Sequence, residues 1–259
     1  MLVTTLGDLL LDVIVRLAAP LEPNDDREAR TEVTAGGQAA NVAAWVAALG
    51  GEARFVGKRG DDAAGALAVR ELSSHGVEVE GPVEGRTGVV VSLAESGRRS
   101  LASDRGSARE LSAAELEPAW FSCDVLHLSG YALAVEPIAS AAARAAELAR
   151  AAGATVALDL SAATLIDDGF RARVHALAPD LVFAAERERD ELGPLDAHWL
   201  VKRGAAGVVV DGEPFAAVPT DVVDPTGAGD AFAAGFLVGG VELGLAAAAR
   251  CCAKVGAMP

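Results

Sequence analysis

The sequence predicts an α/β protein with a mainly parallel sheet, and two observations support that fold class. Short apolar runs typical of strands alternate along the chain with longer amphipathic runs typical of helices. The 259 residues are 51% hydrophobic and 23% charged, which is the composition of a globular protein with a large core. Because neither an internal repeat nor a low-complexity linker interrupts the sequence, we expect a single domain over residues 1–259.

The predicted helices have recognisable ends. Glycines at positions 50 and 76 follow two of them, since glycine is favoured where the chain leaves a helix with positive φ. Ser112 and Glu115 have the spacing of a capping box, and a helix begins near Pro137. In order, the expected elements are strand Leu2–Leu6, helix Gln38–Leu49, strand Arg54–Val56, helix Asp62–His75, strand Val125–Leu128, a helix from Pro137 to before Gly153, and strands Thr155–Leu160, Leu181–Phe183, Leu200–Lys202 and Val208–Val210.

Two segments, 13–35 and 87–103, break this rhythm with short alternating runs separated by turn residues, as in β-hairpins. We expect them to pair as a small antiparallel sheet that covers one end of the main sheet as a lid. The alternative is that both segments are surface loops.

Charge and composition exclude several classes of protein. The net charge is 22 − 37 = −15 and the pI is about 4.6, which argues against a nucleic-acid partner. The apolar segment 231–249 is broken at Gly239-Gly240, so we expect two short helices, no membrane partner and a cytoplasmic location. Three cysteines without metal-ligand spacing predict neither a disulfide framework nor a zinc site.

The strongest chemical signal is the segment DPTGAGDAF at residues 224–232, in which glycines precede a helix. Backbone N–H groups at a helix start bind phosphate groups. A carboxylate beside an anion site, here Asp230, suggests a base that contacts a nucleophile attacking phosphorus. The alternative is that Asp230 only caps the helix.

A second signal is the segment GGQAAN, where Gly36 and Gly37 precede a helix that carries Asn41 in its first turns. A side-chain amide both donates and accepts hydrogen bonds, which suits a vicinal diol, although it can equally bond to the backbone. A third, weaker signal is Asp8 and Asp12 after the first strand, at the end of a sheet where ligands bind in α/β proteins.

Together these segments resemble the PfkB family of carbohydrate kinases, which has the ribokinase-like fold. DPTGAGDAFAAGFL is similar to the carboxy-terminal signature of that family, and GGQAANVAAWVAALGG with VGKRGDDAAG is similar to the amino-terminal one. GDLLLD and VKRGAAGVVV occur in the expected order. The resemblance implies a three-layer α/β/α Rossmann-like core with a small β-sheet lid, and transfer of the ATP γ-phosphate to a hydroxyl of a small sugar.

The resemblance also implies roles for particular residues. Asp230 is the expected base, and the N–H groups of Gly227, Ala228 and Gly229 are expected to form the anion hole. The substrate-binding positions of the family match Asp12, Gly36, Gly37 and Asn41. Its nucleotide-binding positions match Lys202, Gly204 and Gly207. Its monovalent-cation (K⁺) positions match Asp224 and Thr226.

One motif departs from the family pattern. Members often carry Asn-x-x-Glu, with the Glu helping to organise Mg²⁺, whereas this chain has Ala185 and Glu188 at those positions. Glu188 is therefore a candidate for the magnesium site, and the alternative is one charge of a solvated helix face.

The acceptor is the least defined part of the prediction. Arg105 lies in a segment similar to the Arg-x-x-Ser-Ala of 2-keto-3-deoxygluconate kinases and fructokinases, where a guanidinium suits a sugar-acid carboxylate. The alternatives are a nucleoside kinase, disfavoured because neither lid segment contains an aromatic residue, and a catalytically silent sugar- or nucleotide-binding regulator. The resemblance also makes a homodimer through the lid an expected partner arrangement.

Overall fold

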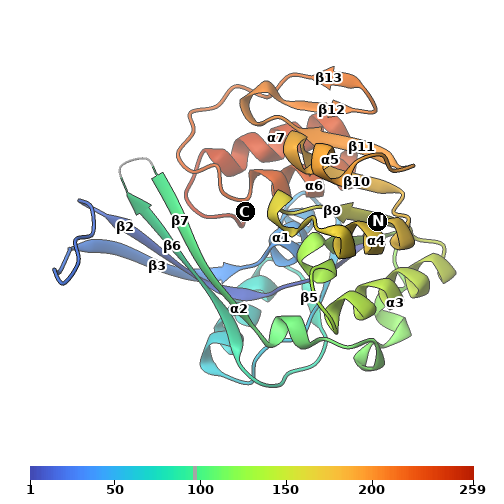
Figure 1. Ribbon diagram of the computed structural model, residues 1–259, viewed down its shortest axis with the longest axis horizontal. Coiled ribbons are helices and arrows are strands. Elements are labelled where there is room, and N and C mark those ends of the chain that lie inside the picture. The colour runs from blue at the N-terminus through green and yellow to red at the C-terminus, as the bar shows by residue number, and fades with distance from the viewer. Residues whose placement is uncertain (96–97) are drawn as a thin grey trace.

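The computed structural model describes residues 1–95 and 98–259, and its largest element is a nine-stranded sheet (Figure 1). The strands run in the order β13-β12-β11-β10-β9-β8-β1-β4-β5. All neighbours from β5 to β11 are parallel, and β12 and β13 join antiparallel at one edge. The bounds are β1 Leu2–Leu6, β4 Glu52–Val56, β5 Glu78–Glu80, β8 Val125–Ser129, β9 Thr155–Asp159, β10 Leu181–Ala185, β11 His198–Lys202, β12 Val208–Val210 and β13 Glu213–Phe215.

Helices cover both faces of this sheet and make three layers. One face packs against α1 (Gln38–Ala48), α2 (Ala63–Ser74), α6 (Ala228–Gly239) and α7 (Val241–Cys252), and the other against α3 (Ile138–Ala151), α4 (Asp168–Leu177) and α5 (Glu186–Leu192). Short 3₁₀ turns lie at Ser107–Glu110, Ala113–Glu115, Pro118–Phe121, Gly130–Leu133, Ala163–Leu165 and Gly204–Ala206.

Small side chains allow these helices to lie close to the sheet. Six alanines of α3 are buried, and Phe183 of β10 packs edge-on against Phe232 and Phe236 of α6. Because alanine loses no side-chain entropy and offers little volume, the core gains contact area by close approach of backbones rather than by large side chains. The helix α6 is thereby held directly over the sheet.

A second, four-stranded sheet projects from the core in Figure 1, in the order β3-β2-β6-β7. Its strands are β2 (Leu10–Leu17), β3 (Ala29–Gly36), β6 (Thr87–Glu95) and β7 (Arg98–Gly106). The pairs β2–β3 and β6–β7 are antiparallel hairpins, whereas the two hairpins meet through a parallel β2–β6 pair. The expected antiparallel arrangement thus holds within each hairpin but not between them.

The remaining differences from the expected elements are at short or polar segments. The first of the two helices expected in segment 231–249 begins earlier than that segment, at Ala228, with Gly227 as its N-cap. The chain breaks at Gly239-Gly240 into α6 and α7, as the sequence predicts. β5, β13 and α4 are additional elements. Among the described residues, every helix is too short or too polar to cross a lipid bilayer.

Candidate active site

Polar side chains converge at the carboxyl edge of the main sheet, where β1, β8, β9 and β11 end. Ser129, Asp159 and Lys202 are the last residues of β8, β9 and β11, respectively. The helices α1 and α6 begin at the same edge, so their N-termini face these side chains. Ligands of open α/β sheets bind at this edge, and the structure therefore gathers the predicted motifs where that rule expects them.

Asp230 lies in the first turn of α6, and its carboxylate contacts α1 rather than the backbone of its own helix. Oδ2 accepts a hydrogen bond from Nδ2 of Asn41 over 2.8 Å. The side chain forms no cap, since Gly227 is the N-cap residue, so the capping interpretation does not apply. Burial raises the pKa of Asp230 to about 7, with Asn41 acting in the opposite direction. A carboxyl with this pKa can exchange a proton near neutral pH.

Gln38 connects Asp230 to two hydroxyl groups. Its Oε1 accepts from Oγ of Ser129 and from Oγ of Ser161, each over 2.5 Å. Its side chain also hydrogen bonds to Asp230 and lowers the pKa of that carboxyl. Sequence reasoning did not single out these residues, although Gln38 stands inside the GGQAAN motif. Asn41 is bonded to a side chain, so the expected alternative of a backbone-bonded amide is wrong.

The N-terminus of α6 has the backbone that an anion site requires. Gly227 has φ +79°, and a Cβ there would lie 2.5 Å from Cβ of Ala257, so only glycine fits. Of the three expected donors, the N–H of Ala228 donates to the Pro225 carbonyl oxygen over a long 3.3 Å. The N–H groups of Gly227, Ala228 and Gly229 thus lie at the N-terminus of α6, which is the positive end of the helix dipole.

A buried charge cluster lies beside this helix end. Lys202 Nζ forms an ion pair with Asp159 Oδ2 at 2.6 Å, and the Asp159 side chain is 1% exposed. The same ammonium lies 3.2 Å from the position that a Cβ on Gly229 would occupy. Burial opposes the charge of Lys202, but the charges of Asp159, Glu188 and Asp230 raise its pKa. Lys202 is therefore a cation next to the candidate anion hole.

Glu188 is buried rather than solvated. Its Oε2 accepts from the N–H of Ala185 over 2.7 Å at the start of α5, and burial raises its pKa. The interpretation of Glu188 as a solvated surface charge is thus wrong. Glu188 provides carboxylate oxygens, the donors that Mg²⁺ prefers. Within the described part of the chain, no group of three or more His, Cys, Asp or Glu side chains could by itself hold a metal ion.

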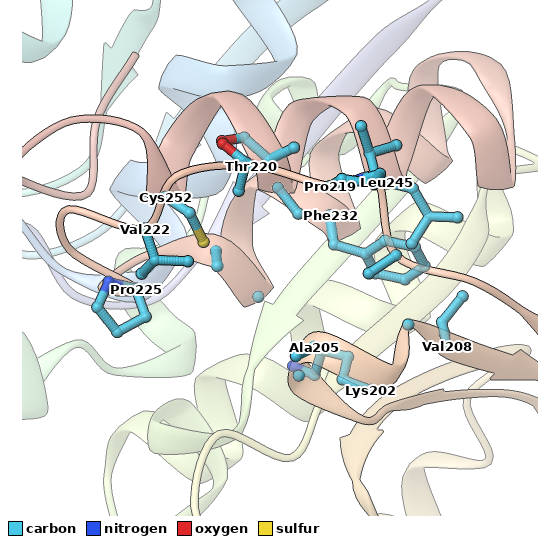
Figure 2. Close-up of a pocket in the computed structure, with 18 residues that line it drawn as sticks. Lys202, Ala205, Val208, Pro219, Thr220, Val222, Pro225, Phe232, Leu245 and Cys252 are labelled. Atoms are coloured by element: carbon cyan, nitrogen blue, oxygen red, sulfur yellow. The ribbon is translucent and has the colours of Figure 1, made fainter.

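A cavity of about 680 Å³ opens beside Lys202 and the start of α6 (Figure 2). Gly207 forms one wall with φ +92°, and a Cβ there would lie 2.0 Å from the Phe215 carbonyl oxygen. The walls are mostly apolar side chains and backbone, contributed by Lys202, Gly204, Ala205, Gly207, Val208, Ala217, Val218, Pro219, Thr220, Val222, Pro225, Ala228, Gly229, Phe232, Leu245, Ala248, Ala249 and Cys252. All three residues expected to line the nucleotide site, Lys202, Gly204 and Gly207, lie here.

Asp224 organises the loop that precedes α6. Its Oδ1 accepts from the backbone N–H of Thr226 over 2.9 Å and from Oγ1 of Thr226 over 2.5 Å, and its Oδ2 accepts from the N–H of Gly256 over 3.3 Å. The two residues expected at a monovalent-cation site are thus bonded to each other. These bonds hold the loop against the C-terminal segment of the chain.

Asp12 and Asp8 flank the glycines at the start of α1. A Cβ on Gly36 would lie 2.2 Å from the Asp12 carboxylate, and one on Gly37 would lie 2.2 Å from the Asp8 carbonyl oxygen. The Arg105 guanidinium forms an ion pair with the Asp8 carboxylate. All five residues therefore lie on the side of the site that faces the second sheet.

Comparisons with known proteins extend over the whole chain. The model of the pfkB family of carbohydrate kinases matches residues 2–258. A fructokinase from Escherichia coli is 33% identical, over 94% of this chain and 85% of the relative. An ATP-dependent ribose-1-phosphate kinase from Halopiger xanaduensis is also 33% identical, over 96% of this chain and 90% of the relative. The solved structure of adenosine kinase from Sinorhizobium meliloti has a TM-score of 0.87 and 26% identity, covering 99% of this chain and 95% of that one.

Proposed function

Because the chain belongs to the pfkB family of carbohydrate kinases, we propose that it transfers the γ-phosphate of ATP to a hydroxyl group of a small sugar, with Asp230 as the base. The observation that carries this proposal is the position of Asp230. Its carboxylate stands at the N-terminus of α6, beside the 680 Å³ cavity, and is bonded to Asn41 on the opposite side. ATP as the donor is supported by the name of the Halopiger relative.

The chemistry follows from these positions. Asp230 accepts the proton of the sugar hydroxyl as its oxygen bonds to the γ-phosphorus and the bond from that phosphorus to the leaving β-phosphate oxygen breaks. The N–H groups of Gly227, Ala228 and Gly229 stabilise the charge on the transferring group. The Ala228 N–H exchanges its long bond to Pro225 for the phosphoryl oxygen.

Lys202 supplies a positive charge at the same point. Its ammonium contacts the phosphate oxygens, while Asp159 holds it in position from below. Mg²⁺ bound with ATP would take a carboxylate oxygen of Glu188 as a protein ligand, and it would neutralise phosphate charge. The apolar cavity between Gly204, Gly207 and α7 takes the base of the nucleotide.

The sugar is held on the other side of Asp230. Asp12 and Asn41 bind hydroxyl groups, and Gly36 and Gly37 let the ligand approach the backbone. The second sheet closes over this region as a lid and excludes water, which limits hydrolysis of ATP.

A monovalent cation binds beside Asp224 and Thr226. Replacing K⁺ by Na⁺ in the assay is therefore expected to lower kcat/KM.

Assembly and location are separate parts of the proposal. The second sheet exposes Val33 and Leu101, 51% and 58% accessible, and its edge strands have open backbone groups that a second copy can pair. A homodimer through this sheet is tested by light scattering of the purified protein. The proposed cytoplasmic location is tested by fractionation.

Two rival functions have specific support. The adenosine kinase neighbour favours a nucleoside acceptor, but none of the strands β2, β3, β6 and β7 carries an aromatic side chain that could stack on a base. The alanine at position 185, where the family often has Asn, favours a silent regulator.

The deciding experiment is an ADP-release assay with Mg²⁺ and K⁺, using fructose, ribose and adenosine as acceptors and Asp230→Asn as the blank. We expect turnover with a sugar that disappears in the blank. Adenosine as the best acceptor would overturn the sugar assignment. ATP binding without turnover on any acceptor would favour the regulator.

A further inference from the structure

Resting on the proposed function, we propose that the Asp8–Arg105 ion pair restricts the acceptor to an uncharged polyol, and that Asp8 is the specificity-determining residue. The sequence assigned no role in substrate choice to Asp8, and it suggested that Arg105 binds the carboxylate of a sugar acid. The structure points to a different use for that guanidinium.

Arg105 is already engaged from two directions. Its guanidinium forms an ion pair with the Asp8 carboxylate, and their side chains are 11% and 2% exposed. The same guanidinium stacks on Tyr131, with Cζ 3.5 Å from the ring centroid. An ion pair at this depth is not screened by solvent, and a stacked face adds a cation–π contact. Arg105 therefore offers no net positive charge to a ligand.

The other charges near the acceptor are negative. Asp12 lies against Gly36, and Asp230 is bonded to Asn41, so two further carboxylates lie beside the glycine and the amide that we assign to the acceptor. A carboxylate or phosphate on the acceptor would be brought close to these carboxylates. Like charges brought together in a partly dehydrated site cost several factors of ten in affinity.

Among the residues that the structure describes, the other cations nearby have acidic partners or lie on an outer cleft. Lys202 is paired with Asp159 on the nucleotide side, and Lys58 is paired with Glu84 and Glu115 at 3.0 Å each. Arg86 and Arg109 lie with Arg105 on a small outer cleft of about 270 Å³. That cleft also carries Asp104 and Glu110, and Arg86 is paired with Asp104 at 2.7 Å. Hydroxyl groups, in contrast, can donate to the carboxylates of the site.

The test compares matched acceptors with and without an anionic group. We expect kcat/KM for fructose to exceed that for 2-keto-3-deoxygluconate and for ribose 1-phosphate by at least about 100-fold. In Asp8→Asn, which keeps the shape of the side chain but releases the charge of Arg105, we expect the ratio of kcat/KM for the sugar acid to that for fructose to rise at least about tenfold. The double variant Asp8→Asn/Arg105→Gln should lose that gain.

Asp104→Asn is the matched control, since it removes an exposed carboxylate from a neighbouring arginine pair and should leave the ratio unchanged. A wild-type enzyme that phosphorylates an anionic acceptor as well as fructose would overturn the inference, even if Asp8→Asn failed to fold. An unchanged ratio in a folded Asp8→Asn protein would also overturn it. If the proposed function itself were wrong, the assay would give a different result, because no sugar, neutral or anionic, would be turned over.

Discussion

The nucleotide side and the acceptor side of the site are lined by different kinds of groups. The cavity on the nucleotide side is walled by backbone and apolar side chains, and Lys202 is the single charged residue among its described lining residues. The acceptor side instead holds Asp8, Asp12 and Arg105, with Asp230 at the boundary between the two. In the proposed function, ATP is thus expected to be bound by shape and backbone groups, and the sugar by charged side chains.

This contrast has an energetic consequence. Backbone groups and apolar walls tolerate changes that preserve shape, since they leave no charge without a partner. A buried ion pair tolerates little change. Removing one partner leaves the other charge buried without compensation, which lowers the free energy of unfolding by about 3–5 kcal/mol. Substitutions on the acceptor side and at the boundary should therefore alter chemistry and specificity, and those on the nucleotide wall should alter ATP affinity.

The largest expected effect is at the boundary. Asp230→Asn removes the base while keeping the hydrogen-bonding shape, so kcat should fall about 10³-fold, within the range for general-base catalysis. Nucleotide binding, measured by calorimetry with a non-hydrolysable ATP analogue, should change less than about twofold. Asp221→Asn, at an exposed acid on the loop before α6, is the control and should retain full activity. Loss of both turnover and nucleotide binding would contradict a purely chemical role.

The next effect concerns the Lys202–Asp159 ion pair, and it separates the catalytic role of the Lys202 charge from its contribution to stability. Lys202→Met should lower kcat about 10²-fold and destabilise the fold by about 3–5 kcal/mol, because Asp159 is left buried without its cation. Lys202→Met/Asp159→Leu should recover most of the free energy of unfolding in urea denaturation but none of the activity. Recovery of activity would show that Lys202 acts only through packing.

The smallest of these effects concerns the apolar wall. Gly207→Ala forces a Cβ toward the Phe215 carbonyl, and we expect the KM for ATP to rise about tenfold with the KM for the sugar unchanged. Gly212→Ala is the matched control, since its φ is also +92° but the added Cβ would meet no atom within 4 Å. Equal effects of the two variants would mean that backbone strain, rather than the wall, sets ATP affinity.

The sequence predicted the layered α/β core because buried parallel strands and glycine-closed helices have strong local signals. It also identified Asp230 and the glycines proposed for the anion hole as candidates, because they lie within one contiguous motif. The pair Asp8–Arg105 joins residues 97 positions apart, since 105 − 8 = 97, and Lys202–Asp159 joins two strand ends. The hydrophobic periodicity of the sequence does not show which distant residues form such pairs, so the pairs are seen only in the folded structure.

Gln38 shows a further limit of sequence reasoning. The residue stood inside a recognised motif, yet its neighbours Ser129 and Ser161 come from strand ends about 90 and 120 positions later, and single serines carry little signal. The same holds for Glu188, whose polar surroundings in the sequence resemble a solvated helix face although the side chain is buried. Burial depends on which elements the topology brings together.

The central claim, that Asp230 is the base joining the two halves, is tested most directly by the pH dependence of kcat/KM for the sugar in the wild type and in Asn41→Leu. Catalysis requires the ionised carboxylate, and burial raises its pKa to about 7, so kcat/KM should fall about tenfold per pH unit below that value and level off above it. The amide of Asn41 lowers this pKa, so its removal should shift the midpoint upward. Because titration of ATP is common to both proteins, the shift isolates Asp230. A flat profile between pH 5 and 8, or an identical midpoint in the two proteins, would contradict the assignment.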